Sequence, residues 1–73
     1  MNEYLVVIER EGDSWGAYCP DLPGAGVAGD SRDEVERLVR EAVSRHLEAL
    51  RRPGDPIPAP SAVGTTLVEV PAA

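Results

Sequence analysis

Hydrophobic residues in the second half of the chain recur with a helical spacing. Between Ser31 and Arg52 the aliphatic positions fall three or four residues apart, which places them on one stripe of a helix: Val35, Leu38, Val39, Ala42, Val43, Leu47 and Leu50. Ser31 has a hydroxyl suited to an N-cap, and Glu34 predicts a capping box in which its carboxylate returns to the Ser31 amide. Pro53 and Gly54 end the pattern. The spacing therefore predicts one amphipathic helix over residues 31–52.

The first part of the chain alternates with a period of two instead. Residues 4–10 are rich in β-branched and aromatic side chains, which predicts a strand. One face of that strand carries Tyr4, Val6 and Ile8. The other face carries Leu5 and Val7, so both faces are apolar and the strand is expected in the middle of a sheet.

Three further strands are expected around this one. Turn residues at 11–14 precede a second strand over residues 15–19, antiparallel to the first. Small residues at 25–29 predict a short third strand. After the helix, four prolines within residues 53–60 predict a stiff, extended connector. A last strand is then expected over residues 65–70, lying parallel beside the first strand.

The resulting order, β-β-β-α-β, predicts an α+β fold with a small, mostly antiparallel sheet and one helix packed on one face. A single helix leaves apolar side chains on the other face uncovered, and we therefore expect a homo-oligomer, either a dimer or a tetramer. We expect residues 1–73 to form a single domain, with its core in residues 3–70 and no C-terminal DNA-binding module.

Composition narrows the partners that this domain is expected to have. Thirteen acidic and seven basic residues give a formal net charge of -6. Because nucleic-acid binding depends on neutralising phosphates, direct DNA binding is not expected. The acidity either suits a basic protein partner or serves solubility. The single cysteine fits a cytoplasmic protein, and no apolar run approaches the roughly 20 residues that span a membrane.

The residues that could carry chemistry do not form a convincing catalytic set. Ribonuclease-H-type chemistry needs several carboxylates converging on two metal ions. The candidates Glu9, Asp21 and Asp30 fall at a strand end, in a turn and at the start of the helix. His46 lies on the flank of the apolar stripe, and Cys19 has the character of a small buried hydrophobe. We therefore expect a protein that is not an enzyme and needs no metal or cofactor.

Candidate partner-binding residues lie in the second strand and in the loop that follows it. Trp15 and Tyr18 point to opposite faces, so either both are core or one packs under the helix while the other faces a partner. The loop of residues 20–24 is stiffened by two prolines and either shapes a corner or offers a preorganised contact surface. The candidate contact residues are Trp15, Tyr18, Asp21, Leu22 and Pro23.

These segments in combination resemble the HicB antitoxin family, specifically its N-terminal domain. The segments that carry the resemblance are residues 4–9, the aromatic strand 15–19, the Pro-Asp-Leu-Pro-Gly loop 20–24, the Gly-Asp-Ser start of the helix at 29–31 and the proline-rich connector 56–61. The resemblance implies a partial ribonuclease-H-like fold that dimerises and blocks a small basic ribonuclease toxin of the HicA type. The alternative is an orphan, stand-alone oligomeric domain that binds a small ligand or another protein without a toxin partner.

Overall fold

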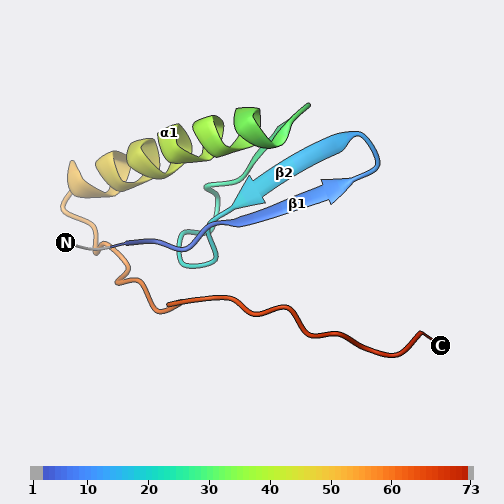
Figure 1. Cartoon of the computed structure of the whole chain (residues 1–73). Helices are drawn as coiled ribbons and strands as arrows, with labels where there is room; N and C mark the ends of the chain where they lie inside the picture. Colours follow the sequence, from blue (N-terminus) through green and yellow to red (C-terminus); the bar gives the residue numbers. More distant parts are fainter. Residues whose placement is uncertain (1–2, 73) are drawn as a thin grey trace.

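A three-stranded antiparallel sheet with one helix on one face forms the body of the molecule (Figure 1). The computed structural model describes residues 3–72. Its elements are β1 (Val7–Glu11), β2 (Ser14–Tyr18), β3 (Val27–Gly29) and α1 (Arg32–Arg51). The predicted α+β layout, a three-strand meander followed by one helix, is confirmed. No helix in the described part of the chain has the length and apolar character to cross a membrane.

A two-residue loop closes the hairpin between β1 and β2. Glu11 pairs with Ser14, which leaves Gly12 and Asp13 between them. Gly12 has a φ of +61°, and a positive φ at the first of two loop residues is the pattern of a type II′ turn. This turn matches the right-handed twist of the strands, so the hairpin register follows from the local sequence.

The start of α1 confirms the predicted cap but differs from the predicted capping box. The Ser31 hydroxyl accepts a hydrogen bond from the Glu34 amide at 3.1 Å, as an N-cap does. The Glu34 carboxylate accepts its bond from the amide of Asp30 at 2.6 Å, so the prediction that it returns to Ser31 was wrong by one residue. The Glu34 side chain can reach Asp30 because Gly29 has no Cβ. A Cβ at Gly29 would lie only 3.0 Å from Glu34 Cδ and would block this position of the carboxylate.

The core lies between α1 and the side of the sheet that faces it. Two clusters of buried side chains fill this space: Ala17 with Val35 and Val39, and Cys19 with Leu22 and Ala25. Tyr4, Val6 and Ile8 pack against these clusters, so the face that they were predicted to share is the one that points toward the helix. Every buried residue on α1 belongs to the predicted apolar stripe.

The last predicted strand is not formed in this chain. Gly54, with a φ of +77°, follows the end of α1, and residues 55–72 then run without helix or strand. Residues 63–70, which we call the tail, extend away from the body on the β1 side (Figure 1). Prolines in the connector donate no amide hydrogen bonds and keep it extended, so it does not turn the tail back along β1. The prediction of a strand paired within the chain was therefore wrong.

Candidate protein-binding surfaces

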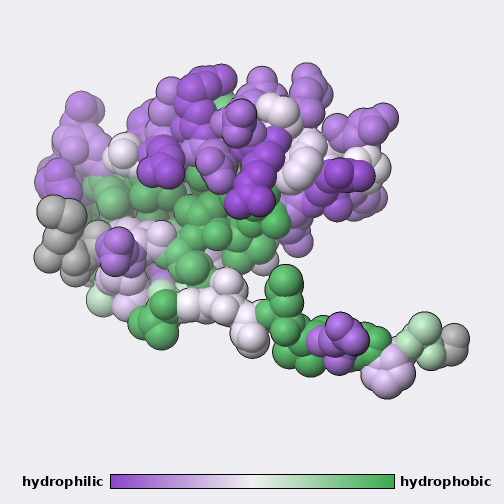
Figure 2. All heavy atoms as spheres, viewed as in Figure 1, coloured by the Kyte–Doolittle hydropathy of each residue, from purple (hydrophilic) through white to green (hydrophobic). Residues whose placement is uncertain are grey.

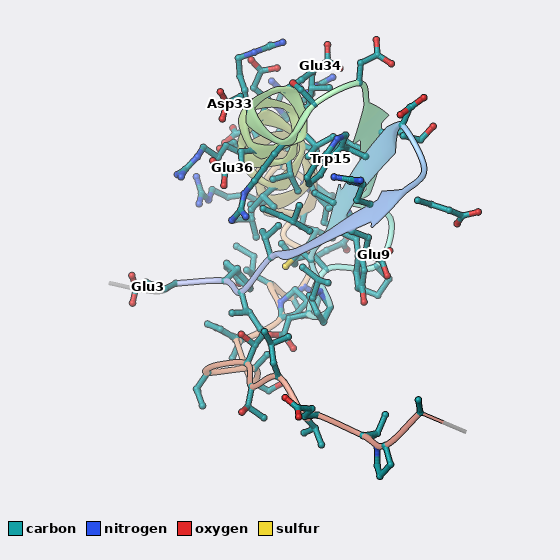
Figure 3. All side chains as sticks on the ribbon, turned by 45° about the vertical axis from the view of Figure 1, so that its right-hand side comes forward. Glu3, Glu9, Trp15, Asp33, Glu34 and Glu36 are labelled. Atoms are coloured by element: carbon teal, nitrogen blue, oxygen red, sulfur yellow. The ribbon has the colours of Figure 1, made fainter. Side chains whose placement is uncertain are left out.

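Trp15 and Tyr18 lie on opposite faces of β2. Trp15 is partly buried against the core cluster and lies between α1 and the sheet (Figure 3). The Arg10 guanidinium lies 5.7 Å from the Trp15 ring centroid, within the range of a cation–π contact. Tyr18 is 41 % exposed and pairs across the open face of the sheet with Val7 of β1. Trp15 therefore belongs to the core, whereas the Tyr18 side chain is accessible.

The loop that follows β2 divides its residues between core and surface. Leu22 is fully buried, while Pro23 is exposed. The Leu22 amide donates to the Cys19 carbonyl, and the Ala25 amide donates to the Leu22 carbonyl, each at 3.1 Å. Leu22 thus anchors the loop from inside the molecule. A contact between a partner and this loop stays a prediction, and Pro23 is the loop residue placed to make it.

Asp21 holds the connector that follows α1. Its carboxylate accepts hydrogen bonds from the Ser61 hydroxyl at 2.7 Å, the Ser61 amide at 3.0 Å and the Ala62 amide at 3.1 Å. These bonds, the Ser61 hydroxyl first among them, lower the pKa of Asp21 below its ordinary value. The Tyr4 hydroxyl donates to the Pro58 carbonyl and makes a second attachment. Asp21 therefore acts within this chain, a role that its sequence neighbours do not indicate.

Exposed carboxylates gather where the hairpin meets the start of α1. Gly29 pairs with Trp15 close to the hairpin turn, so the helix begins at the same end of the sheet as the turn. We call this surface the acidic end; its residues are Glu9, Glu11, Asp13, Asp30 and Asp33. Figure 3 shows that Glu9 lies on the side of the sheet away from α1, whereas Asp33 lies on the outer side of the helix. The acidic end therefore spans two elements and faces several directions.

An open apolar groove lies between α1 and β1. Its volume is about 720 Å³. The residues that give it apolar character are Tyr4, Val6 and Ile8 on one side and Val39, Val43 and Leu47 on the other. The groove exists because α1 packs mainly over β2 and β3 and leaves the β1 side less covered. Figure 2 shows a continuous apolar surface below α1, and further apolar atoms along the tail. Sequence reasoning missed this groove, because it placed the uncovered apolar surface on the far face of the sheet.

The candidate catalytic groups are dispersed over the fold. Glu9 and Asp30 are exposed, and Asp21 is occupied by the connector. Within residues 3–72, no group of three or more His, Cys, Asp or Glu side chains could hold a metal ion. Cys19 is buried in the core, and His46 lies beside the loop, where a Cβ at Gly24 would be 3.7 Å from its Cε1 atom. These positions give Cys19 and His46 packing roles.

Comparison with known proteins identifies related sequences along most of the chain. Residues 4–71 match the family described as HicB-like antitoxin of bacterial toxin–antitoxin systems. Antitoxin HicB 2 of Photorhabdus laumondii is 33% identical over 69 residues, which cover 94% of this chain and 50% of that protein. An uncharacterized 14.9 kDa protein of Haemophilus phage HP1 is 33% identical over 55 residues, covering 75% of this chain and 41% of the phage protein.

A third relative is closer to this chain in length. A UPF0150 protein of Synechocystis sp. is 34% identical over 56 residues, which cover 75% of this chain and 71% of that protein. The chain thus spans about half the length, or less, of the Photorhabdus and phage relatives, with 50% and 41% of those proteins covered.

Proposed function

The chain belongs to the HicB-like antitoxin family of bacterial toxin–antitoxin systems, and from this premise we propose that it binds and neutralises a small basic ribonuclease toxin of the HicA type. The observation that supports toxin binding is the acidic end, where five exposed carboxylates from β1, the hairpin turn and the start of α1 outnumber the two arginines of the same segments, Arg10 and Arg32. The chain as a whole carries a net charge of -6. A basic toxin would be attracted over a distance of several ångströms, which speeds encounter and orients it.

Neutralisation would follow from competition for the toxin's basic surface. A ribonuclease holds the phosphates of its substrate with arginine and lysine side chains. Carboxylates on a rigid two-residue hairpin can occupy the same cations at little cost in entropy, because their backbone is already ordered. The proposed role is therefore binding without catalysis, in the cytoplasm where the toxin meets RNA. It requires no metal or cofactor and no direct contact with DNA. The proposal also includes a homo-oligomer, a dimer or a tetramer.

The test is co-expression with a HicA-type toxin, to be sought among small basic proteins encoded beside this chain's gene. We expect a complex that co-purifies and protects RNA from cleavage by that protein. The association rate constant should fall about tenfold or more between 0.05 and 0.5 M salt, because electrostatic steering is screened. Failure of the neighbouring protein to form any complex would overturn the proposed function.

A matched pair of variants tests whether the acidic end is the surface used. The double variant Glu11→Gln with Asp13→Asn removes two charges from the hairpin. The double variant Asp55→Asn with Glu69→Gln removes two charges from the connector and the tail. The first pair should slow association about tenfold and the second less than about twofold. Equal effects of the two pairs would exclude the acidic end as the contact surface.

A second candidate function is an oligomeric domain that binds a small ligand or another protein without a toxin partner. The groove between α1 and β1 favours this alternative, because small-molecule sites are concave, mostly apolar and carry a few polar groups. Arg40 and Arg51 are the cationic groups that line it. A small molecule that binds in the groove, together with no toxin complex, would favour this function over the first.

A further inference from the structure

The tail is apolar and yet exposed to solvent. The exposed fractions are 97 % for Val63, 100 % for Leu67, 77 % for Val68 and 73 % for Val70. Monomeric proteins rarely leave so many neighbouring aliphatic side chains uncovered, and such sets mark interaction sites. Valine, leucine and threonine dominate the segment, and this composition favours an extended strand. The tail therefore has the character of a strand that lacks a neighbour within its own chain.

The body of the molecule has an open strand edge that matches the tail. The sheet order β1-β2-β3 leaves the outer edge of β1 without a neighbouring strand among the described residues. The amide and carbonyl groups along such an edge are free to pair with an added strand. The apolar groove borders the same edge, since Val6 and Ile8 line it. A strand added there would pair with β1 and turn alternate side chains toward the groove.

We propose that the tail of one copy adds to the β1 edge of a second copy as a fourth strand, and that the exchange is reciprocal. Each copy would then donate one strand and receive one, which gives a dimer with two-fold symmetry. Addition of an extended segment to a sheet edge is a common mode of protein association, in which main-chain hydrogen bonds provide affinity and side-chain pockets provide specificity. This dimer gives a structural form to the homo-oligomer included in the proposed function, but it needs no toxin, so it can fail while toxin binding still holds.

The connector explains why the strand pairs with a second copy and not with its own sheet. Asp21 holds Ser61 and Ala62, and Tyr4 holds Pro58, so the point where the tail leaves the body is fixed. Prolines before this point stiffen the connector, so the tail leaves the body in a fixed direction and forms no strand beside its own β1. Figures 1 and 3 show the tail directed away from the body in both views.

Charge also fits an exchange between copies. Two molecules with a net charge of -6 repel each other, and a contact between them needs segments of low charge. Glu69 is the one charged residue in the tail, and the groove that would receive the tail contains Arg40 and Arg51 together with Glu36, whose carboxylate is paired with Arg32. Residues of the acidic end do not line this groove, so the dimer would leave the acidic end open to a basic partner.

Sedimentation of the full chain tests the proposal. We expect a concentration-dependent dimer whose dissociation constant rises about 30-fold or more in the double variant Leu67→Glu with Val68→Glu. The variant should keep the far-UV circular dichroism of the parent, because Leu67 is fully exposed within a single chain. The control Ala28→Glu places a charge on β3, at the opposite edge of the sheet from β1, and should leave the dimer intact. A dimer kept in the tail variant, whether or not Ala28→Glu disrupts it, or no dimer at all, would overturn the proposal.

Mixed-label NMR separates exchange from folding back. One copy carries a nitroxide at Ala72→Cys, just beyond the tail, and contains no ¹⁵N; Cys19 is buried and stays unlabelled. The second copy is ¹⁵N-labelled and has no nitroxide. Exchange predicts broadening of β1 amides in the second copy, with β3 amides unaffected. A second sample carries the nitroxide and ¹⁵N in the same chain. If β1 amides broaden in this second sample but not in the mixed one, the tail folds back on its own chain and the proposal is overturned. The proposal is also overturned if β1 amides broaden in neither sample.

Discussion

Replacing Leu22 by alanine tests whether the loop after β2 is anchored in the core. Leu22 is fully buried in the cluster with Cys19 and Ala25, and Tyr4 and Leu47 pack against that cluster. The substitution removes three carbon atoms, and at about 0.8 kcal/mol for each buried group the loss of burial alone costs ~2.4 kcal/mol. The cavity left behind adds to this, and buried leucine-to-alanine changes cost about 2–5 kcal/mol in all. We expect ~3 kcal/mol for Leu22→Ala.

A loss of this size is large for a domain of 73 residues. Domains this small have a free energy of unfolding of about 4–11 kcal/mol, taking ~0.05–0.15 kcal/mol per residue. The same change should lower the melting temperature by about 12–24 °C, since 1 kcal/mol shifts a domain of this length by ~4–8 °C. Urea unfolding followed by the fluorescence of Trp15, the single tryptophan, measures the difference.

The matched control is Leu67→Ala, the same substitution at a fully exposed leucine. Measured at dilutions where sedimentation shows single chains, it should change the free energy of unfolding by less than ~0.5 kcal/mol. If Leu22→Ala also cost less than ~1 kcal/mol, the buried position of Leu22 would be refuted. A loop free to present Leu22 to a partner would then be the better description.

Two further predictions concern hydrogen bonds made by carboxylates. Gly29→Ala should lower the free energy of unfolding in urea titrations by ~1 kcal/mol, because the new Cβ would displace the Glu34 carboxylate from the Asp30 amide. In a Glu34→Ala background, Gly29→Ala should add no cost. A cost that persists in that background would contradict this cause. Folding lowers the pKa of Asp21, so the ionised carboxylate should hold the connector above pH ~4, and the contact should be lost as pH falls through the lowered pKa. The NMR shifts of the Ser61 and Ala62 backbone amides should change with pH as Asp21 titrates. The prediction is contradicted if these shifts do not depend on pH, or if the same pH dependence persists in Asp21→Asn.

Secondary structure and the choice of buried faces were largely predictable because they depend on neighbouring residues. The apolar stripe of α1, its Ser31 cap and its end just before Pro53 and Gly54 all follow from spacings of one to four residues. The alternation within residues 4–8 likewise grouped Tyr4, Val6 and Ile8 on one face, and the fold turned that face toward the helix. The capping box failed by one residue, because the reach of Glu34 depends on the empty space at Gly29 and not on spacing alone.

The candidate surfaces were less predictable because they join residues that are distant in sequence. Asp21 resembled an ordinary turn residue until the fold brought it to Ser61, 40 positions later. The acidic end similarly depends on the pairing of Gly29 with Trp15, which brings the start of α1 to the hairpin turn. The groove depends on α1 lying mainly over β2 and β3 and less over β1. The periodicity of side chains along the sequence does not determine that position.

Residues 65–70 show how far the local sequence determines structure and where contacts between distant residues take over. Their alternation and composition indicate a strand, and the chain there is extended as that pattern implies. A strand, however, is completed only by a neighbour, and which edge it meets depends on how the connector is held by Asp21 and Tyr4. Local periodicity therefore determined each element's conformation and inner face, while the partners of those elements were decided by contacts that form only once the whole chain has folded.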